Sequence, residues 1–141
     1  MFKTDGARLR ARFLSVLAVT GLLLAACSTT ASPSASAGAA DCITAEAGVV
    51  TLTAEDLAFS TACIEVPAGE AFTIEFANND SAPHDVAIFQ DDSKATELFK
   101  GDVVDADQSA TYEVDALDAG EYYFECTIHP TMNGIVRAVA A

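Results

Sequence analysis

The chain has 141 residues, of which 51% are hydrophobic, and its 21 Asp and Glu against seven Lys and Arg give a formal net charge of −14. Such an acidic chain repels nucleic-acid phosphates, so nucleic acid is not an expected partner. The length suffices for one domain with one hydrophobic core.

The N-terminus has the pattern of a secretory signal. Four basic residues (Lys3, Arg8, Arg10 and Arg12) precede an apolar run over residues 13–26, which is too short to span a bilayer comfortably. The run ends Leu-Ala-Ala-Cys at Cys27 and resembles a bacterial lipobox, in which the cysteine is lipidated and becomes the mature N-terminus. We therefore predict a lipoprotein signal peptide over residues 1–26. The alternative is ordinary cleavage that leaves Cys27 as a spare thiol, which is a liability in an exported protein.

Residues 27–41 are rich in Ser and Ala, and such a composition buries too little apolar surface to offset the entropy of ordering. We expect a flexible tether that holds a domain at residues 42–141 outside the cytoplasm, lipid-anchored to the bacterial cell membrane. Cleavage before Cys27 would leave three basic and 20 acidic residues, a formal charge of −17. The acidity has two open explanations, solubility and steering towards a basic redox partner.

Beyond the tether the chain is composed of short segments with period-two alternation and turn residues between them. The segment 71–77 alternates cleanly, with three apolar residues on one face. The expected strands are residues 49–53, 63–66, 71–77, 84–89, 109–114, 120–126 and 134–139. Residues 90–107 are polar with little periodicity, and a short helix is expected near residues 95–100. Short strands without a long helical pattern predict an all-β fold, a Greek-key β-sandwich.

The segment 120–134 contains the residues with the most specific chemistry. Cys126, His129 and Met132 have Cys-x2-His-x2-Met spacing at the end of an aromatic, alternating strand. His84 is the only other histidine of the chain. Two imidazoles and a thiolate with a weak axial thioether form the ligand set of a blue copper site. Each residue alone would be read as a loop histidine, a core methionine or a buried thiol, but their combination and order favour a metal site.

The segments 76–86 (Phe-Ala-Asn-Asn-Asp-Ser-Ala-Pro-His-Asp-Val) and 126–132 (Cys-Thr-Ile-His-Pro-Thr-Met) resemble the cupredoxin family, most closely its plastocyanin and amicyanin branch. The resemblance covers roughly residues 49–139. It implies the same β-sandwich, with His84, Cys126 and His129 as equatorial ligands and Met132 as the axial ligand. One position departs from the family pattern: many members have Asn after the first histidine, whereas this chain has Asp85. Asp85 can accept a hydrogen bond from Thr127, and its charge near the metal would favour Cu(II).

Two of the four cysteines remain once Cys27 is assigned to lipid and Cys126 to metal. In an exported protein the pair Cys42 and Cys63 is most simply a disulfide. A second metal site is the alternative, but no further histidine is available for it.

The expected cofactor is one copper ion per chain, cycling between Cu(I) and Cu(II) in a monomer. Copper is favoured over zinc because structural zinc sites take four Cys or His ligands and have no use for Met132. The expected function is transfer of single electrons between redox proteins at the outer face of the membrane. The alternative is a copper-binding or delivery protein, which would favour an exchangeable site rich in Met or His. An enzyme is not expected, because multicopper oxidases need further histidines for their other coppers.

Overall fold

The computed structural model describes residues 41–140. Every regular secondary-structure element in this range is a β-strand. The predicted signal peptide, Cys27 and all of the tether except Asp41 lie outside the described residues. The strands are β1 (Ile43–Thr44), β2 (Val49–Glu55), β3 (Ala58–Phe59), β4 (Cys63–Pro67), β5 (Phe72–Asn78), β6 (Ala87–Phe89), β7 (Glu97–Lys100), β8 (Ser109–Val114), β9 (Gly120–Glu125) and β10 (Asn133–Val139). No helix in the described range is long and apolar enough to cross a membrane.

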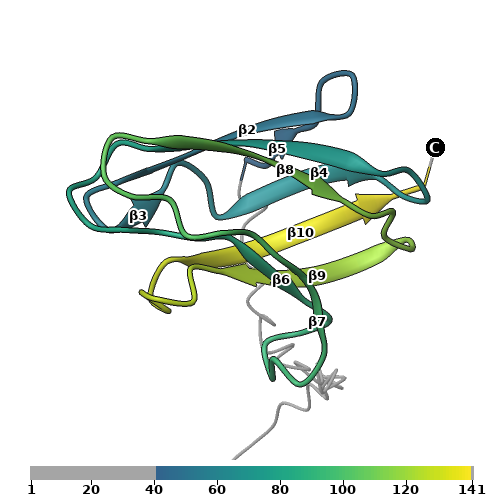
Figure 1. The fold of residues 1–141 in the computed structure, drawn as a ribbon. Helices are drawn as coiled ribbons and strands as arrows, with labels where there is room; N and C mark the ends of the chain where they lie inside the picture. The colour runs from purple at the N-terminus through teal and green to yellow at the C-terminus, as the bar shows by residue number, and fades with distance from the viewer. Residues whose placement is uncertain (1–40, 141) are drawn as a thin grey trace, which may run out of the picture. The chain divides into compact units, whose positions relative to one another are not determined.

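The strands form two sheets that face each other as two layers (Figure 1). One sheet has six strands in the order β1-β4-β10-β9-β6-β7, and the other has four in the order β3-β2-β5-β8. The chain passes through the opposite sheet between the partners of each parallel pair, which are β1 with β4, β2 with β5 and β4 with β10. A two-sheet fold whose chain crosses between the layers in this way is a Greek-key β-sandwich. The prediction of an all-β sandwich is therefore confirmed.

The core lies between the layers and follows from the period-two alternation of the strands. In β5, Phe72, Ile74 and Phe76 are at most 2% exposed, and Val50 and Leu52 of the neighbouring β2 are equally buried. Burial of this apolar surface is the main stabilising contribution to the fold. The packed sandwich gives the loops at its ends a rigid frame.

The prediction of a short helix near residues 95–100 is wrong. The structure has strand β7 there, and it pairs antiparallel with β6 at the edge of the six-stranded sheet. The local sequence carries no strand periodicity, because an edge strand is exposed on most of its surface and three of the four residues of β7 are exposed. Pairing with β6, whose three residues are all buried, decides the conformation.

The predicted disulfide between Cys42 and Cys63 is present. Cys63 is fully buried at the start of β4, and β1 follows directly after Cys42 and pairs with β4. The bond therefore fastens the beginning of the domain to the six-stranded sheet.

Replacing both cysteines, as Cys42→Ala with Cys63→Ala, should lower the free energy of unfolding by about 3 kcal/mol, because the unfolded chain is no longer constrained by the cross-link. Urea unfolding of the metal-free protein measures this loss. Reductant should destabilise the wild-type protein similarly and leave the variant unchanged. Equal free energies of unfolding for the wild type and the variant without reductant would contradict the prediction.

Candidate metal centre

His84 is positioned by the loop that follows β5. The side chain of Asn78, fully buried at the end of β5, donates from Nδ2 to the carbonyl oxygens of Ala82 (2.8 Å) and Val104 (3.0 Å). The backbone of His84 also forms two hydrogen bonds with Val104, at 3.0 and 2.8 Å. These contacts fix the position of His84, whose side chain is fully buried.

Cys126 and Met132 lie at the two ends of one short loop between β9 and β10. The N–H of Cys126 donates to the carbonyl oxygen of Met132 (2.9 Å), and the N–H of Met132 donates to that of His129 (2.9 Å). Gly134 follows, at a point where any side chain would collide with the carbonyl oxygen of Ala62. The loop is thus closed on itself, and β10 is held tightly after it.

The structure brings His84, Cys126 and His129 together, with one donor atom from each lying within 4.8 Å of the others. Nδ1 of His84 is 3.2 Å from Nδ1 of His129, and Sγ of Cys126 is 3.6 Å from the first nitrogen and 3.9 Å from the second. This triangle accommodates one ion at bond lengths of about 2.0–2.1 Å from imidazole nitrogen and about 2.3 Å from thiolate sulfur. Met132 is 2% exposed and lies at the end of the same loop. The donor set therefore fits a copper ion.

Asp85 connects the two segments that carry these donors. Its carboxylate accepts hydrogen bonds from the N–H of Thr127 (2.6 Å) and from the Thr127 hydroxyl (2.5 Å). The predicted contact with Thr127 is therefore confirmed. Burial works to raise the pKa of Asp85, but the ammonium of Lys100 and the bonds from Thr127 outweigh it and hold that pKa below its usual value.

Lys100, on β7, was not anticipated from the sequence as part of this site. Its Nζ lies 2.7 Å from Asp85 Oδ2 and donates to the Thr127 hydroxyl oxygen at 2.7 Å. The negative charge of Asp85 is thus opposed by a cation. The expected preference for Cu(II) that arises from the charge of Asp85 is therefore smaller than the sequence suggested.

A second carboxylate, Asp80, contacts the ring of His84 on the side away from Cys126. Asp80 Oδ2 lies 3.2 Å from Nε2 of His84 and accepts a hydrogen bond from the N–H of Leu57 at 2.8 Å. The Leu57 N–H, followed by the His84 ring and the N–H of Ser81, outweighs desolvation and lowers the pKa of Asp80 to about 2. The sequence analysis missed this residue too.

Apolar side chains are exposed around the loops that carry the donors. Ile128, on the Cys126–Met132 loop, is 41% exposed, and Leu57, at the turn between β2 and β3, is 51% exposed. Val103, which precedes the Val104 that pairs with the backbone of His84, is 53% exposed. Figure 1 shows β3 and the β9–β10 loop at the same end of the sandwich. Met132, in contrast, is buried and is not part of this exposed group.

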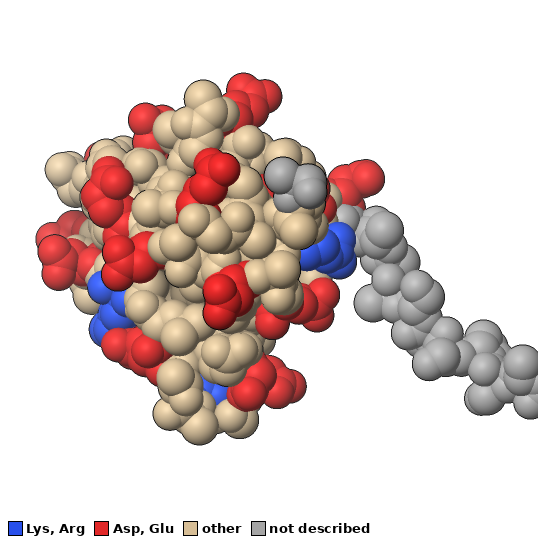
Figure 2. All heavy atoms as spheres, turned by 90° about the vertical axis from the view of Figure 1, so that its right-hand side faces the viewer, with Lys and Arg blue, Asp and Glu red and all other residues tan. Residues whose placement is uncertain are grey.

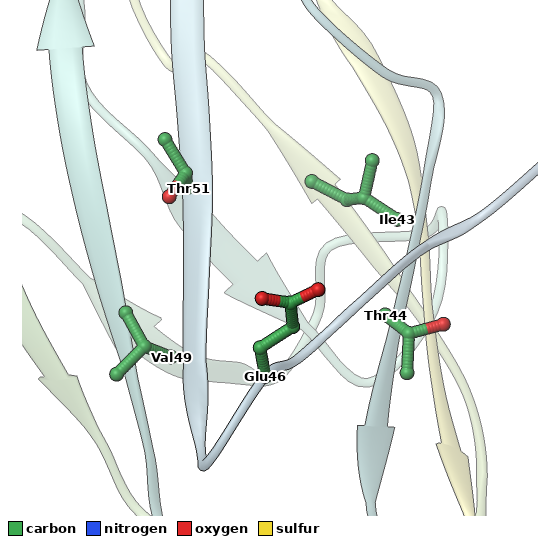
Figure 3. A pocket seen from close by; sticks show the side chains of 5 residues that line it. All are labelled: Ile43, Thr44, Glu46, Val49 and Thr51. Atoms are coloured by element: carbon green, nitrogen blue, oxygen red, sulfur yellow. The ribbon is translucent and has the colours of Figure 1, made fainter.

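A separate hollow of about 320 Å³ lies beside β1 and the start of β2 and contains none of the four predicted ligands. Figure 3 shows its lining residues, Ile43, Thr44, Glu46, Val49 and Thr51. Glu46 is the only titratable group among them, so this hollow offers no ligand set for a metal.

The sequence and the fold of this chain are similar to those of known proteins. A family model described as "Cupredoxin-like domain" matches residues 17–137. Amicyanin from Paracoccus versutus is 32% identical over 90 residues. That match covers 64% of this chain and 64% of the relative, so it spans less than two thirds of the relative's length.

Solved structures with the same fold include amicyanin from Paracoccus versutus, with a TM-score of 0.51 at 30% identity over 67% of this chain and 84% of that chain. Reduced auracyanin from Roseiflexus castenholzii has a TM-score of 0.60 at 18% identity, over 67% of this chain and 98% of that chain. Auracyanin A from Chloroflexus aurantiacus, described as a "blue" copper protein, has a TM-score of 0.59 at 18% identity, over 64% and 98%. At 18% identity the likeness shows the fold alone.

Proposed function

Because this chain belongs to the cupredoxin-like family, we propose that it is a mononuclear blue copper protein that carries single electrons between redox partners. His84, Cys126 and His129 are the proposed equatorial ligands and Met132 the axial ligand. The observation that carries the proposal is the close triangle of two imidazole nitrogens and one thiolate sulfur, with a buried methionine at the end of the same loop.

Bound copper would supply a one-electron Cu(I)/Cu(II) couple. The residues of the chain hold the donors in place for it: Asn78 fixes the approach to His84, and the Cys126–Met132 hydrogen bond closes the other loop. Because both segments are anchored in the sandwich, the donors need little rearrangement between the two oxidation states. A site of this kind suits repeated electron transfer.

His129 is the proposed route between this site and a partner. Its side chain is only partly buried, whereas His84 and Cys126 are completely buried. The exposed apolar side chain of Ile128 lies beside it on the loop and offers a surface for short-lived contacts with a redox protein. The formal net charge of −14 favours a basic partner over an acidic one through long-range attraction, and Figure 2 shows numerous acidic and few basic side chains on the face opposite the β9–β10 loop.

A visible spectrum of the protein with Cu(II) tests the proposal. We expect an intense thiolate-to-copper absorption band that disappears on reduction and returns on oxidation. A protein that binds Cu(II) without this band would be a copper-binding or delivery protein instead. Nothing in the geometry favours that alternative, because His84 and Cys126 are fully buried and the chain has only two methionines and two histidines.

Met132 should tune the reduction potential rather than hold the metal, because an axial thioether is a long, weak contact. Met132→Leu should keep the copper and its colour and raise the potential, since a donor to Cu(II) is lost. Met132→Gln, with a stronger oxygen donor, should lower it. A redox titration of the three proteins side by side measures both shifts. If both variants titrate like the wild type, Met132 is not a ligand.

We also propose that the protein is exported and anchored to the outer face of the bacterial cell membrane by lipid on Cys27. The support is the Leu-Ala-Ala-Cys sequence and the Ser- and Ala-rich segment behind it. Cys27→Ala should move the protein out of the membrane fraction or block its processing, as followed by mass spectrometry and fractionation. Ser28→Ala, which leaves the cysteine in place, is the control. Unchanged mass and membrane association of Cys27→Ala would contradict lipidation.

A further inference from the structure

We propose that Asp80 is a positioning residue for His84, an inference that rests on the proposed copper function. Its carboxylate holds the ring proton of His84 on Nε2, so that the lone pair of Nδ1 faces Cys126 and His129. It also places a negative charge directly behind a ligand, which favours Cu(II) over Cu(I). Asp80 was not among the residues that the sequence pattern or the donor triangle selected.

The two ring nitrogens of His84 have different neighbours. Nε2 lies 3.2 Å from Asp80 Oδ2, whereas Nδ1 lies 3.6 Å from Cys126 Sγ. A neutral imidazole has one N–H and one lone pair, and an ionised carboxylate only accepts hydrogen bonds. The proton therefore lies on Nε2, and Nδ1 is left as the metal donor. A ligating histidine that donates its other N–H to a carboxylate becomes both better oriented and more basic.

Asp80 is itself held in place. The oxygen that faces His84 also accepts the N–H of Leu57 (2.8 Å), and the other oxygen accepts the N–H of Ser81 (2.7 Å). The N–H of Asp80 donates to the side-chain oxygen of Asn78 at 2.9 Å. The carboxylate thus has a fixed orientation, and its contact with His84 does not depend on a freely rotating side chain.

Burial makes the contact more than a surface ion pair. The side chain of His84 is 0% exposed and that of Asp80 is 12% exposed, so water has little access to the Nε2 side of the ring. In most exposed pairs water would replace a lost carboxylate at small cost. Here the N–H of His84 would lose its partner, and the charge of Asp80 would not be replaced.

The experiment compares Asp80→Asn with Asp56→Asn in the full-length protein. The amide of Asn keeps an oxygen acceptor for His84 and Leu57, removes the charge, and gives up the acceptor of the exposed Ser81 N–H. Asp56 lies at the exposed turn between β2 and β3, at a positive φ of 51° that Asn tolerates, and the carboxylate paired with His84 is that of Asp80. The control therefore removes the same charge nearby without touching the ligand.

For Asp80→Asn we expect Cu(II) affinity to fall about tenfold, at the low end of the range measured when outer-shell partners of ligating histidines are mutated, and Cu(I) affinity to fall less. A tenfold change in the ratio of the two affinities raises the reduction potential by about 59 mV, the factor for a one-electron couple. Asp56→Asn should leave the ratio nearly unchanged. Equal shifts in the two variants would overturn the proposal, because the effect would then be general electrostatics.

A second measurement does not require copper. Nitrogen NMR of the metal-free protein, well above the ordinary histidine pKa of about 6.5, reports which ring nitrogen carries the proton. We expect His84 to carry it on Nε2 in the wild type and in Asp56→Asn, and to populate both tautomers in Asp80→Ala. A single Nε2–H tautomer in folded Asp80→Ala would overturn the proposal. The absence of a blue band in the wild type would refute the copper function, while the tautomer result would still decide the role of Asp80.

Discussion

Cys126→Ser should abolish the intense visible band of the copper-loaded protein. The thiolate is the only anionic donor in the triangle, and the band arises from charge transfer between this sulfur and Cu(II). A serine hydroxyl at the same place stays protonated at neutral pH and makes no comparable bond. The variant should bind Cu(II) more weakly, with a spectrum that lacks the band.

The fold should survive this substitution, because the two side chains are similar in size. Cys126 is, however, 0% exposed, so the new hydroxyl should lower the free energy of unfolding by about 1–3 kcal/mol if it finds no partner. Thr131→Ser, an exposed change in the same loop, is the control and should keep the full band. A Cys126→Ser protein that retains the band would contradict the assignment of Cys126 as ligand.

The four candidate ligands could be proposed from the sequence because three of them lie in one segment. The spacing of Cys126, His129 and Met132 is local, and a strand followed by a tight loop leaves little freedom in how they are presented. His84 was assigned because the chain has no other free histidine. The structure brings it to 3.6 Å from Cys126, across 42 residues of sequence.

The residues that support the donors could not be predicted in the same way. Asn78 and Asp80 belong to an ordinary polar turn sequence, and nothing local distinguishes the carboxylate of Asp80 from the other acids of the chain. Lys100 reaches Asp85 only because β7 pairs with β6, and that pairing is a tertiary contact. Such partners cannot be found from a local sequence pattern, because their contacts form only when the chain folds.

The strands, too, could be predicted where the local sequence has a pattern and were missed where it has none. Strands with a clean alternation, such as β5, β8 and β9, were predicted nearly to their ends. The two-residue strands β1 and β3 were missed, since two residues show no periodicity. The strand predicted from His84 begins only at Ala87, because the backbone of His84 pairs with Val104 rather than with a sheet neighbour.

Lys100→Met should destabilise the protein more than an ordinary surface change. It leaves the carboxylate of Asp85, which is 0% exposed, without its cation. Breaking a fully buried pair typically costs about 3–5 kcal/mol. The side chain of Lys100 is 41% exposed, so water replaces part of its charge, and we expect a smaller loss of about 2 kcal/mol.

A substitution of Asp85, the residue that pairs with Lys100, makes the prediction specific to this ion pair. Asp85→Asn keeps an oxygen acceptor for the N–H of Thr127 and supplies a neutral side chain of the same shape. In the double variant, Asp85→Asn with Lys100→Met, no buried charge is left unpaired. Its loss of stability should therefore be smaller than the sum of the two single losses, with a coupling energy of about 1–2 kcal/mol.

Urea unfolding of the four metal-free proteins measures this coupling without any contribution from metal binding. Lys94→Met is the matched control, because Lys94 pairs with a different buried carboxylate, Glu125, at 3.2 Å. Combined with Asp85→Asn it should be additive. Additive losses for Asp85 and Lys100 as well would mean that their 2.7 Å contact contributes nothing to stability, and that Thr127 alone holds Asp85 in place.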